Sequence, residues 1–177
     1  MRSYQRQLFL LVLGAMFGAL LCISQVVMAG LPNIELISLL IIVWTRVFRV
    51  HALPGIGVFV LLQGLLYGFS IWWMSYLYIW FILWGIVMLV PQGREAVNGR
   101  LYAGRALGWA ILSGAYGFSF GALTAIPWLI TGGPKTALAY WLAGISFDIP
   151  HAIGNFVLAL VLAVPLIGAL TRIKRRI

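Results

Sequence analysis

The 177-residue sequence contains very little charge for its length. Only 8% of its residues are charged, whereas 63% are hydrophobic. A water-soluble globular domain needs more polar side chains than this to cover its surface. A helix needs roughly 20 apolar residues to cross a bilayer, so six such helices with short connections account for nearly the whole chain. The composition therefore predicts an all-α integral membrane protein that forms a single domain over residues 1–177.

Acidic and imidazole side chains are also scarce. The only carboxylates are Glu35, Glu95 and Asp148, and there are two histidines. These few side chains provide almost no candidates for acid–base catalysis, and they are too few for a convincing metal site. The sequence contains no HExxH, GxSxG or Walker motif. The usual signatures of metalloproteases, serine hydrolases and ATPases are therefore missing.

Cysteine is nearly absent, because Cys22 is the only one. A single cysteine excludes disulfides within the chain, CxxC redox chemistry and clusters of thiolate metal ligands. Cys22 lies in the apolar run from Leu8 to Met28. This run is too long for a secretory signal and has no convincing cleavage site, so we expect a retained membrane helix.

Proline, glycine and charged residues divide the sequence into hydrophobic segments. The six predicted helices are 8–29, 35–50, 54–71, 76–90, 103–130 and 147–170. Pro127 predicts a break near the end of the fifth helix, and Pro165 predicts a bend in the last. At the end of the second helix we expect Arg46 and Arg49 to extend to the lipid headgroups, with their apolar stems along the helix.

The net charge of +9 follows a topological pattern. If the N-terminus is cytoplasmic, eleven of the 12 Lys and Arg residues lie on the inner side and only Lys135 lies outside. The inner residues are Arg2, Arg6, Arg46, Arg49, Arg94, Arg100, Arg105, Arg172, Lys174, Arg175 and Arg176. The positive-inside rule then places both termini in the cytoplasm. The basic charge is therefore explained by topology and by contact with anionic lipid, and we expect no nucleic-acid binding.

Aromatic residues crowd one of the expected outer junctions. Within nine positions the sequence has Trp72, Trp73, Tyr76, Tyr78 and Trp80, and a second group, Trp128, Tyr140 and Trp141, lies near the next outer loop. Such residues are typical of an interfacial belt. They also suit the lining of a pocket for a ligand with flat apolar surfaces. The sequence leaves both interpretations open.

A polar cluster occurs in the stretch SFDIPHAIGN. Asp148, His151 and Asn155 are three and four residues apart, which places them on one face of a helix. Polar groups in a membrane helix need a partner or a function. Either Asp148 caps the last helix, with Pro150 in its first turn, while His151 and Asn155 bridge to neighbouring helices, or the cluster binds a ligand. Similarly, Glu35 either caps the second helix or contacts a ligand.

Small residues form two overlapping pairs in the first helix. Gly14 and Gly18, together with Ala15 and Ala19, allow another helix to approach closely. The approaching helix can belong to the same chain or to a partner.

Taken together, the length, the six helices, the cytoplasmic ends, the AxxxA pair Ala15 and Ala19 and the stretch FDIPHAIGNF resemble the substrate-binding S components of energy-coupling factor (ECF) vitamin transporters. The resemblance covers essentially the full chain. It implies a multi-pass protein of a bacterial cell membrane that captures a vitamin from outside. It also implies docking on one transmembrane scaffold subunit and two cytoplasmic ATPases, which hydrolyse ATP. The chain itself would have no catalytic residue and no cofactor.

The resemblance also implies roles for individual residues. Ala15 and Ala19 would face the scaffold subunit, with Gly14 and Gly18 in the same interface. The substrate contacts are expected at the outer helix ends, and the candidates are Asn33, Trp72, Trp73, Tyr76, Tyr78, Trp141, Asp148, His151 and Asn155.

The sequence is most similar to cobalamin-specific members of this family, so cobalamin is the expected ligand. Folate, riboflavin, pantothenate and pyridoxine are the alternatives. Two other classes of protein stay open. One is a small membrane enzyme that uses Asp148 and His151 at the outer boundary. The other is an assembly protein that binds no ligand.

Overall fold

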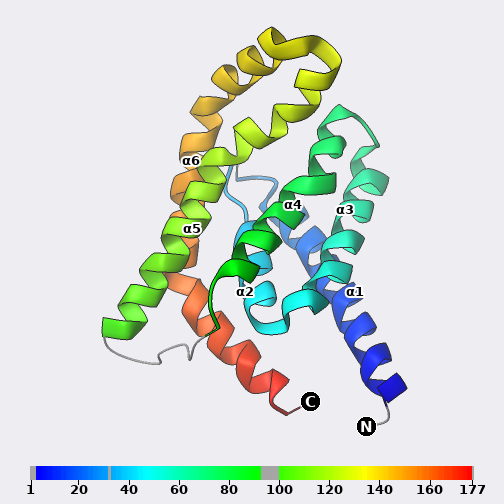
Figure 1. Ribbon diagram of the computed structural model, residues 1–177, viewed down its shortest axis with the longest axis vertical. Helices are drawn as coiled ribbons and strands as arrows, with labels where there is room; N and C mark the ends of the chain where they lie inside the picture. Colours follow the sequence, from blue (N-terminus) through cyan, green and yellow to red (C-terminus); the bar gives the residue numbers. More distant parts are fainter. Residues whose placement is uncertain (1–2, 32, 93–99, 177) are drawn as a thin grey trace.

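The computed structural model describes residues 3–31, 33–92 and 100–176, and all regular secondary structure in these ranges is helical. The elements are α1 (Ser3–Met28), α2 (Ile37–Phe48), the short 3-10 helix η1 (Arg49–Ala52), α3 (Leu53–Tyr67), α4 (Ile71–Leu89), α5 (Arg100–Thr124) and α6 (Ile126–Lys174) (Figure 1). The predicted all-helical class is confirmed.

Five stretches of the described chain are long and apolar enough to cross a membrane. They are Gln7–Met28, Ile37–Tyr67, Ile71–Leu89, Tyr102–Thr124 and Ile126–Lys174. These stretches support a multi-pass membrane protein. The second of them contains a reversal of the chain, because α2 leads through η1 into α3, which runs back (Figure 1). Six crossings therefore stay a prediction.

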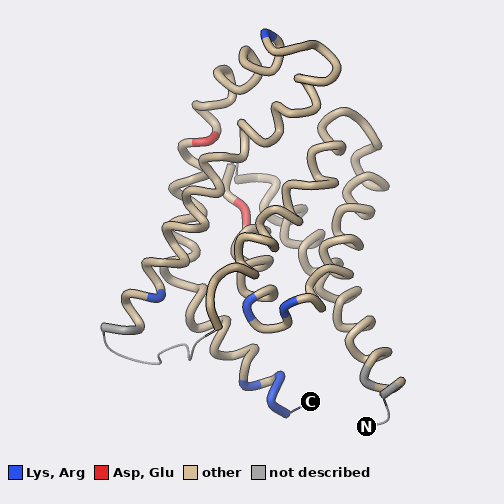
Figure 2. Tube along the Cα trace, viewed as in Figure 1, with Lys and Arg blue, Asp and Glu red and all other residues tan. Residues whose placement is uncertain are grey.

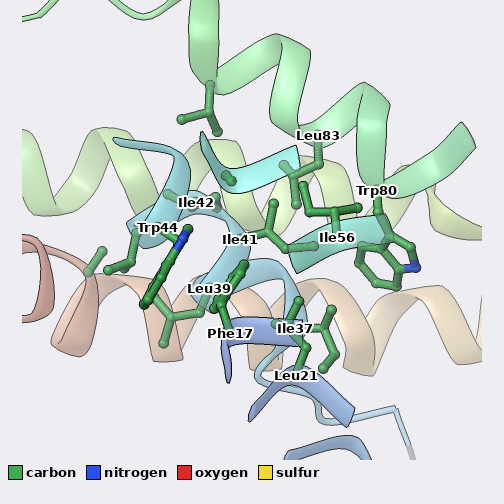
Figure 3. Packing of buried hydrophobic residues seen from close by; sticks show 14 of the residues in the cluster. Phe17, Leu21, Ile37, Leu39, Ile41, Ile42, Trp44, Ile56, Trp80 and Leu83 are labelled. Carbon is green, nitrogen blue, oxygen red and sulfur yellow. The ribbon is translucent and has the colours of Figure 1, made fainter. Parts of the chain in front are cut away.

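Helix α2 forms the centre of the bundle. Every residue of α2 except Leu40 is buried. Its polar residues Ser38, Thr45 and Arg46 are all buried, and polar side chains of a membrane helix are expected to face the bundle interior and not the lipid. Figure 3 shows Ile37 and Ile41 of α2 among side chains of the surrounding helices, including Phe17, Ile56 and Leu83.

The short length of α2 leaves room for an irregular segment before it. Its 12 residues extend about 18 Å, less than the roughly 30 Å of a bilayer core. Residues 29–31 and 33–36, which precede α2, form turns and irregular backbone. At membrane depth such backbone is tolerated where it is enclosed by protein or lines a cavity. The candidate site described below lies at this segment.

Helices α1 and α3 approach through glycine. A Cβ atom on Gly18 would lie 2.7 Å from the carbonyl oxygen of Gly55, and one on Gly55 would lie 2.8 Å from the carbonyl oxygen of Gly14. Gly14 and Gly18 are buried, whereas Ala15 is exposed and Ala19 is partly exposed. The glycines of the predicted partner interface therefore pack within the chain, and the two alanines remain on the outer face of α1.

The break predicted near Pro127 is present. Helix α5 ends at Thr124, and α6 begins at Ile126 with the proline in its first turn. The chain then turns at Gly133, which has a positive φ of 77°, and α6 runs back along α5 (Figure 1). The predicted helices leave residues 131–146 outside any helix, whereas in the structure this stretch is helical on both sides of the kink at Gly133.

Two arginines hold the end of α4. Arg46 is only 3% exposed, and its guanidinium donates to the carbonyl oxygens of Val90 at 3.4 Å and Pro91 at 2.9 Å. Arg49 donates to the carbonyl oxygen of Met88 at 2.8 Å. The last carbonyls of a helix lack partners within it, and guanidinium groups can supply them. The expectation that Arg46 extends to the headgroups is therefore wrong.

Both ends of the chain lie at the same end of the bundle (Figure 1). Figure 2 shows that most of the Lys and Arg positions it colours lie toward this end, with one at the opposite tip. Arg2, Arg94 and Glu95 lie outside the described residues. The side chains of Arg6 and Arg100 are likewise not described.

Candidate functional site

A cavity of about 620 Å³ lies toward the end of the bundle where α1 and α5 finish and α4 begins. Its described walls come from the segment before α2, from the first residue of α2, and from α1, α4, α5 and α6. The lining residues are Gln25, Met28, Ala29, Leu31, Asn33, Ile34, Glu35, Ile37, Trp72, Tyr76, Trp80, Phe120, Gly121, Thr124, Tyr140, Ala143, Gly144, Phe147, Asp148 and His151. Of the nine predicted substrate contacts, Asn33, Trp72, Tyr76, Asp148 and His151 are in this set.

Helix α4 contributes an aromatic wall. Trp72, Tyr76 and Trp80 are four residues apart, so they lie on one face of the helix. Their rings meet edge to face, with centroids 5.2 Å apart for Trp72 and Tyr76 and 5.4 Å apart for Tyr76 and Trp80. Phe120 of α5 continues the wall, 5.7 Å from the Trp80 ring. The wall presents flat apolar surface to a ligand.

Three other predicted aromatic contacts are not among the lining residues. The indole N–H of Trp73 donates to the carbonyl oxygen of Val60 at 2.8 Å. The hydroxyl of Tyr78 donates to the carbonyl oxygen of Leu123 at 2.6 Å. Trp141 is 38% exposed. In the structure, Trp73 and Tyr78 connect helices, and Trp141 lies at the outer surface.

Glu35 joins the segment before α2 to α6. Its carboxylate accepts a hydrogen bond from the backbone N–H of Ser38 at 2.9 Å, in the first turn of α2, and it lies 3.3 Å from Nε2 of His151. Burial raises the pKa of the Glu35 carboxyl, but the hydrogen bonds and the charge of His151, together with Ser38, outweigh this effect and hold the pKa below its usual range. The capping interpretation of Glu35 is confirmed, and the same residue lines the cavity.

Asp148 bonds to the neighbouring helix α5, whereas a helix-capping residue would bond to the first turn of its own helix. Its Oδ1 accepts the backbone N–H of Gly121 on α5 at 3.0 Å, and its Oδ2 has no partner in the described part of the protein. The prediction that Asp148 caps the last helix, with Pro150 in the first turn, is wrong, because α6 begins at Ile126 and both residues lie inside it.

A run of glycines on α5 makes room for the polar face of α6. A Cβ atom on Gly117 would lie 2.9 Å from Nδ2 of Asn155, and one on Gly114 would lie 3.1 Å from Cβ of Phe156. Asn155 is 1% exposed and does not line the cavity. The predicted common face of the polar cluster is confirmed, since Asp148 and His151 are also buried.

Several lining residues were not among the predicted contacts. Gln25 donates from Nε2 to the hydroxyl of Tyr76 at 3.3 Å, and its Oε1 is buried without a partner among the described residues. A glutamine next to Ser24, near the end of a long apolar stretch of the first helix, was the available signal for this residue. The glycines spaced along 114–121 were the signal for the close contact between α5 and α6.

The cavity contains two carboxylates and one histidine, His151, but no Lys or Arg among its described lining residues. The carboxylates, Glu35 and Asp148, are the two within the described ranges. The part of the chain that is described contains no group of three or more His, Cys, Asp and Glu side chains suited to a metal ion. The arrangement offers aromatic surface for stacking and a few hydrogen-bonding groups that would orient a small molecule.

No family model, curated protein or solved structure matches this chain.

Proposed function

We propose that the chain is the substrate-binding membrane subunit of an ECF-type importer that takes up a vitamin. The observation that carries this proposal is the aromatic cavity of about 620 Å³ within a bundle of apolar helices. Cavities of roughly 300–1,000 Å³ with aromatic walls and a few polar groups are typical of small-molecule sites. The length of the chain and the stretch FDIPHAIGNF, which supplies Asp148 and His151 to the cavity, support the ECF assignment.

The topology that fits this function has six crossings and cytoplasmic termini. Both termini share one end of the bundle, and most described Lys and Arg residues gather there (Figures 1 and 2). The positive-inside rule assigns that end to the cytoplasm. The cavity, at the other ends of the same helices, then opens toward the outside, where a nutrient is captured.

Cobalamin is the first ligand to test, ahead of folate, riboflavin, pantothenate and pyridoxine. Cobalamin is larger than the drug-sized molecules that cavities of this volume enclose. We therefore expect one edge of the molecule to enter the cavity, with the remainder covered by the outer ends of the helices. The wall formed by Trp72, Tyr76 and Trp80 is the surface against which its ring would pack.

The test is direct capture of the ligand. The purified chain in detergent is incubated with cobalamin, free ligand is removed by gel filtration, and the visible spectrum of the protein peak is recorded. Stoichiometric cobalamin is expected in the wild type, with much less in a Trp72→Ala/Tyr76→Ala double variant. Tyr4→Ala is the matched control, because Tyr4 is exposed at the start of α1, away from the cavity. A colourless peak from folded wild-type protein would remove cobalamin and require the other vitamins to be tested.

Docking on the ATP-hydrolysing module uses the outer face of α1 in this proposal. Ala15 is exposed and Ala19 partly exposed, so a scaffold helix can approach them without disturbing the contact of α1 with α3. Ala15→Trp or Ala19→Trp should abolish uptake in cells that contain the scaffold subunit and two ATPases. Vitamin binding by the isolated chain should stay near the wild-type value. Normal uptake by both variants would remove this interface.

A small membrane enzyme that uses Asp148 and His151 is the other function raised by the sequence. The two side chains have separate partners, since Asp148 accepts from Gly121 and His151 pairs with Glu35. No described contact couples Asp148 to His151 in the manner of an acid–base pair. Asp148 and His151 both line the cavity, so a binding site can use them in these positions.

A further inference from the structure

We propose that the cavity selects a ligand group that donates hydrogen bonds from nitrogen and carries no negative charge, and that it discriminates against carboxylates and phosphates. This inference rests on the proposed function, because it names the chemical class that the substrate cavity takes. It applies to whichever vitamin the protein binds. It ranks the candidate vitamins by whether they present N–H donors or negatively charged groups to the cavity.

The charge distribution is the first reason. Glu35 and Asp148 line the cavity, and its described lining residues include no Lys or Arg. Glu35 is already paired with His151 at 3.3 Å, so the Asp148 carboxylate is the charge without a cationic partner in hydrogen-bond contact. A second anion placed in this weakly hydrated space would be repelled and would lose its own hydration without compensation.

Buried hydrogen-bond acceptors without a partner are the second reason. Oδ2 of Asp148 and Oε1 of Gln25 are both buried, and neither has a hydrogen-bond partner among the described residues. Both side chains line the cavity. Asp148 is 5% exposed, so water has little access to its carboxylate. Buried acceptors are normally satisfied, and a ligand N–H group is the kind of donor that both lack.

The aromatic wall is consistent with the same class of ligand. Trp80 is 2% exposed, lines the cavity and has an indole N–H without a described partner, so it offers a donor for a ligand carbonyl oxygen. An amide group supplies both an N–H for the acceptors and a carbonyl for this donor. A protonated amine would instead be attracted to the faces of the rings. A carboxylate supplies only acceptors.

The candidate vitamins differ in this respect. Cobalamin carries several carboxamide side chains around its ring, whereas folate and pantothenate present carboxylates. The one phosphodiester of cobalamin must then stay outside the cavity, with a carboxamide edge inside. The charge and hydrogen-bonding groups of the cavity therefore favour cobalamin over folate and pantothenate. This reason is independent of the resemblance of the sequence to cobalamin-specific S components. We also expect an acid made from a favoured ligand to bind poorly.

The test compares ligands that differ only in this group. The full chain in detergent is titrated with cyanocobalamin and its monocarboxylic acid derivatives, nicotinamide and nicotinic acid, and biotinamide and biotin. Riboflavin, thiamine, pyridoxine, folate and pantothenate complete the panel. Binding is followed by thermal shift and by calorimetry. Each ligand that binds is expected to be neutral or cationic, and within a bound pair the amide should bind roughly tenfold or more tightly than the acid.

The variant Asp148→Asn separates a role in selection from a role in folding. It keeps an oxygen for the N–H of Gly121 but removes the negative charge. We expect the affinity ratio of amide to acid to fall toward one. A purely structural Asp148 would lower both affinities and leave the ratio unchanged, which would overturn the inference. Tyr4→Ala, at the start of α1 and away from the cavity, should keep both the affinities and the ratio.

The outcomes separate the two proposals. Binding of a vitamin carboxylate as tightly as its amide, or more tightly, would overturn the charge selection and leave the transport function standing. Folded protein that retains no member of the panel would overturn both. Selective binding of amides or amines, with loss of selectivity in Asp148→Asn, would support both.

Discussion

The contact with Gly121 fixes the position of the Asp148 carboxylate, whose Oδ2 has no hydrogen-bond partner among the described residues. A Cβ atom on Gly121 would overlap the Asp148 carboxylate, so Gly121→Ala must displace it or separate α5 from α6. We expect a destabilisation of about 1–3 kcal/mol, as for other overpacked interiors, together with loss of ligand binding. Thermal unfolding in detergent measures the first effect and titration the second. Gly108→Ala is the control, because a Cβ there meets open space. Equal stability of the two variants would contradict the contact.

The pair formed by Glu35 and His151 predicts a dependence of stability on pH. The folded pKa of Glu35 lies below the ordinary value of 4.5, so the pair stabilises the protein above that value and its contribution is lost as the pH falls through the folded pKa. Glu35→Gln should therefore be less stable than the wild type at neutral pH, by about 1.5–3 kcal/mol. The difference should shrink on acidification. Melting temperatures measured from pH 7 to about pH 3 check this. A difference that stays constant over this range would contradict the assignment.

Single residues were predicted well where the periodicity of one helix decides their position. The spacing of Asp148, His151 and Asn155 placed them on one face, which the structure confirms. Their individual environments depend on other helices, so the sequence could not show that Asn155 meets Gly117 while the other two reach the cavity. The same limit applies to Tyr78, which belongs to the dense aromatic cluster but bonds to α5.

At the scale of elements, α1 has two faces with different sensitivities. Gly18→Val should lower thermal stability strongly, because even a Cβ there would lie 2.7 Å from the carbonyl oxygen of Gly55. Ala15→Val, less than one turn away, should change stability by less than about 0.5 kcal/mol, since Ala15 is exposed on the other face. Thermal unfolding of both purified variants checks the difference. Similar losses in the two would mean that α1 packs in another orientation.

Helix boundaries show what local sequence cannot specify. The second helix was predicted at 35–50 and forms at 37–48. The carboxylate of Glu35, which precedes the helix, accepts a hydrogen bond from its first turn, and Arg49 has a positive φ of 57° after its end. The predicted helices leave residues 131–146 as a loop, and the chain does turn there, at Gly133. The helical structure resumes at once, however, and carries Tyr140 to the cavity. Packing of α6 along α5 favours this continuation, and such packing is not visible in a single segment.

At the scale of the whole molecule, composition alone predicted a bundle of apolar helices, and five long apolar helical stretches in the described residues support this class. The arrangement of the helices was not predictable in this way. All hydrophobic segments look similar in sequence, yet α2 is enclosed by its neighbours and α1 has an exposed apolar face. The cavity results from this arrangement, because the short α2 leaves the preceding irregular segment to form one of its walls.

The orientation of the molecule in the membrane gives a prediction that does not depend on the ligand. Lys135 lies close to the turn at Gly133, and Arg176 lies after the end of α6, so six crossings with cytoplasmic termini place them on opposite sides. In a Cys22→Ala background, Lys135→Cys should react with a membrane-impermeant maleimide in intact cells. Arg176→Cys should react only after permeabilisation. Cys22→Ala alone provides the unlabelled control, because Cys22 is the only cysteine.

The opposite pattern would invert the bundle and turn the cavity toward the cytoplasm, where it could not capture a nutrient from outside. Labelling of both positions in intact cells would exclude an α6 that crosses the membrane between them.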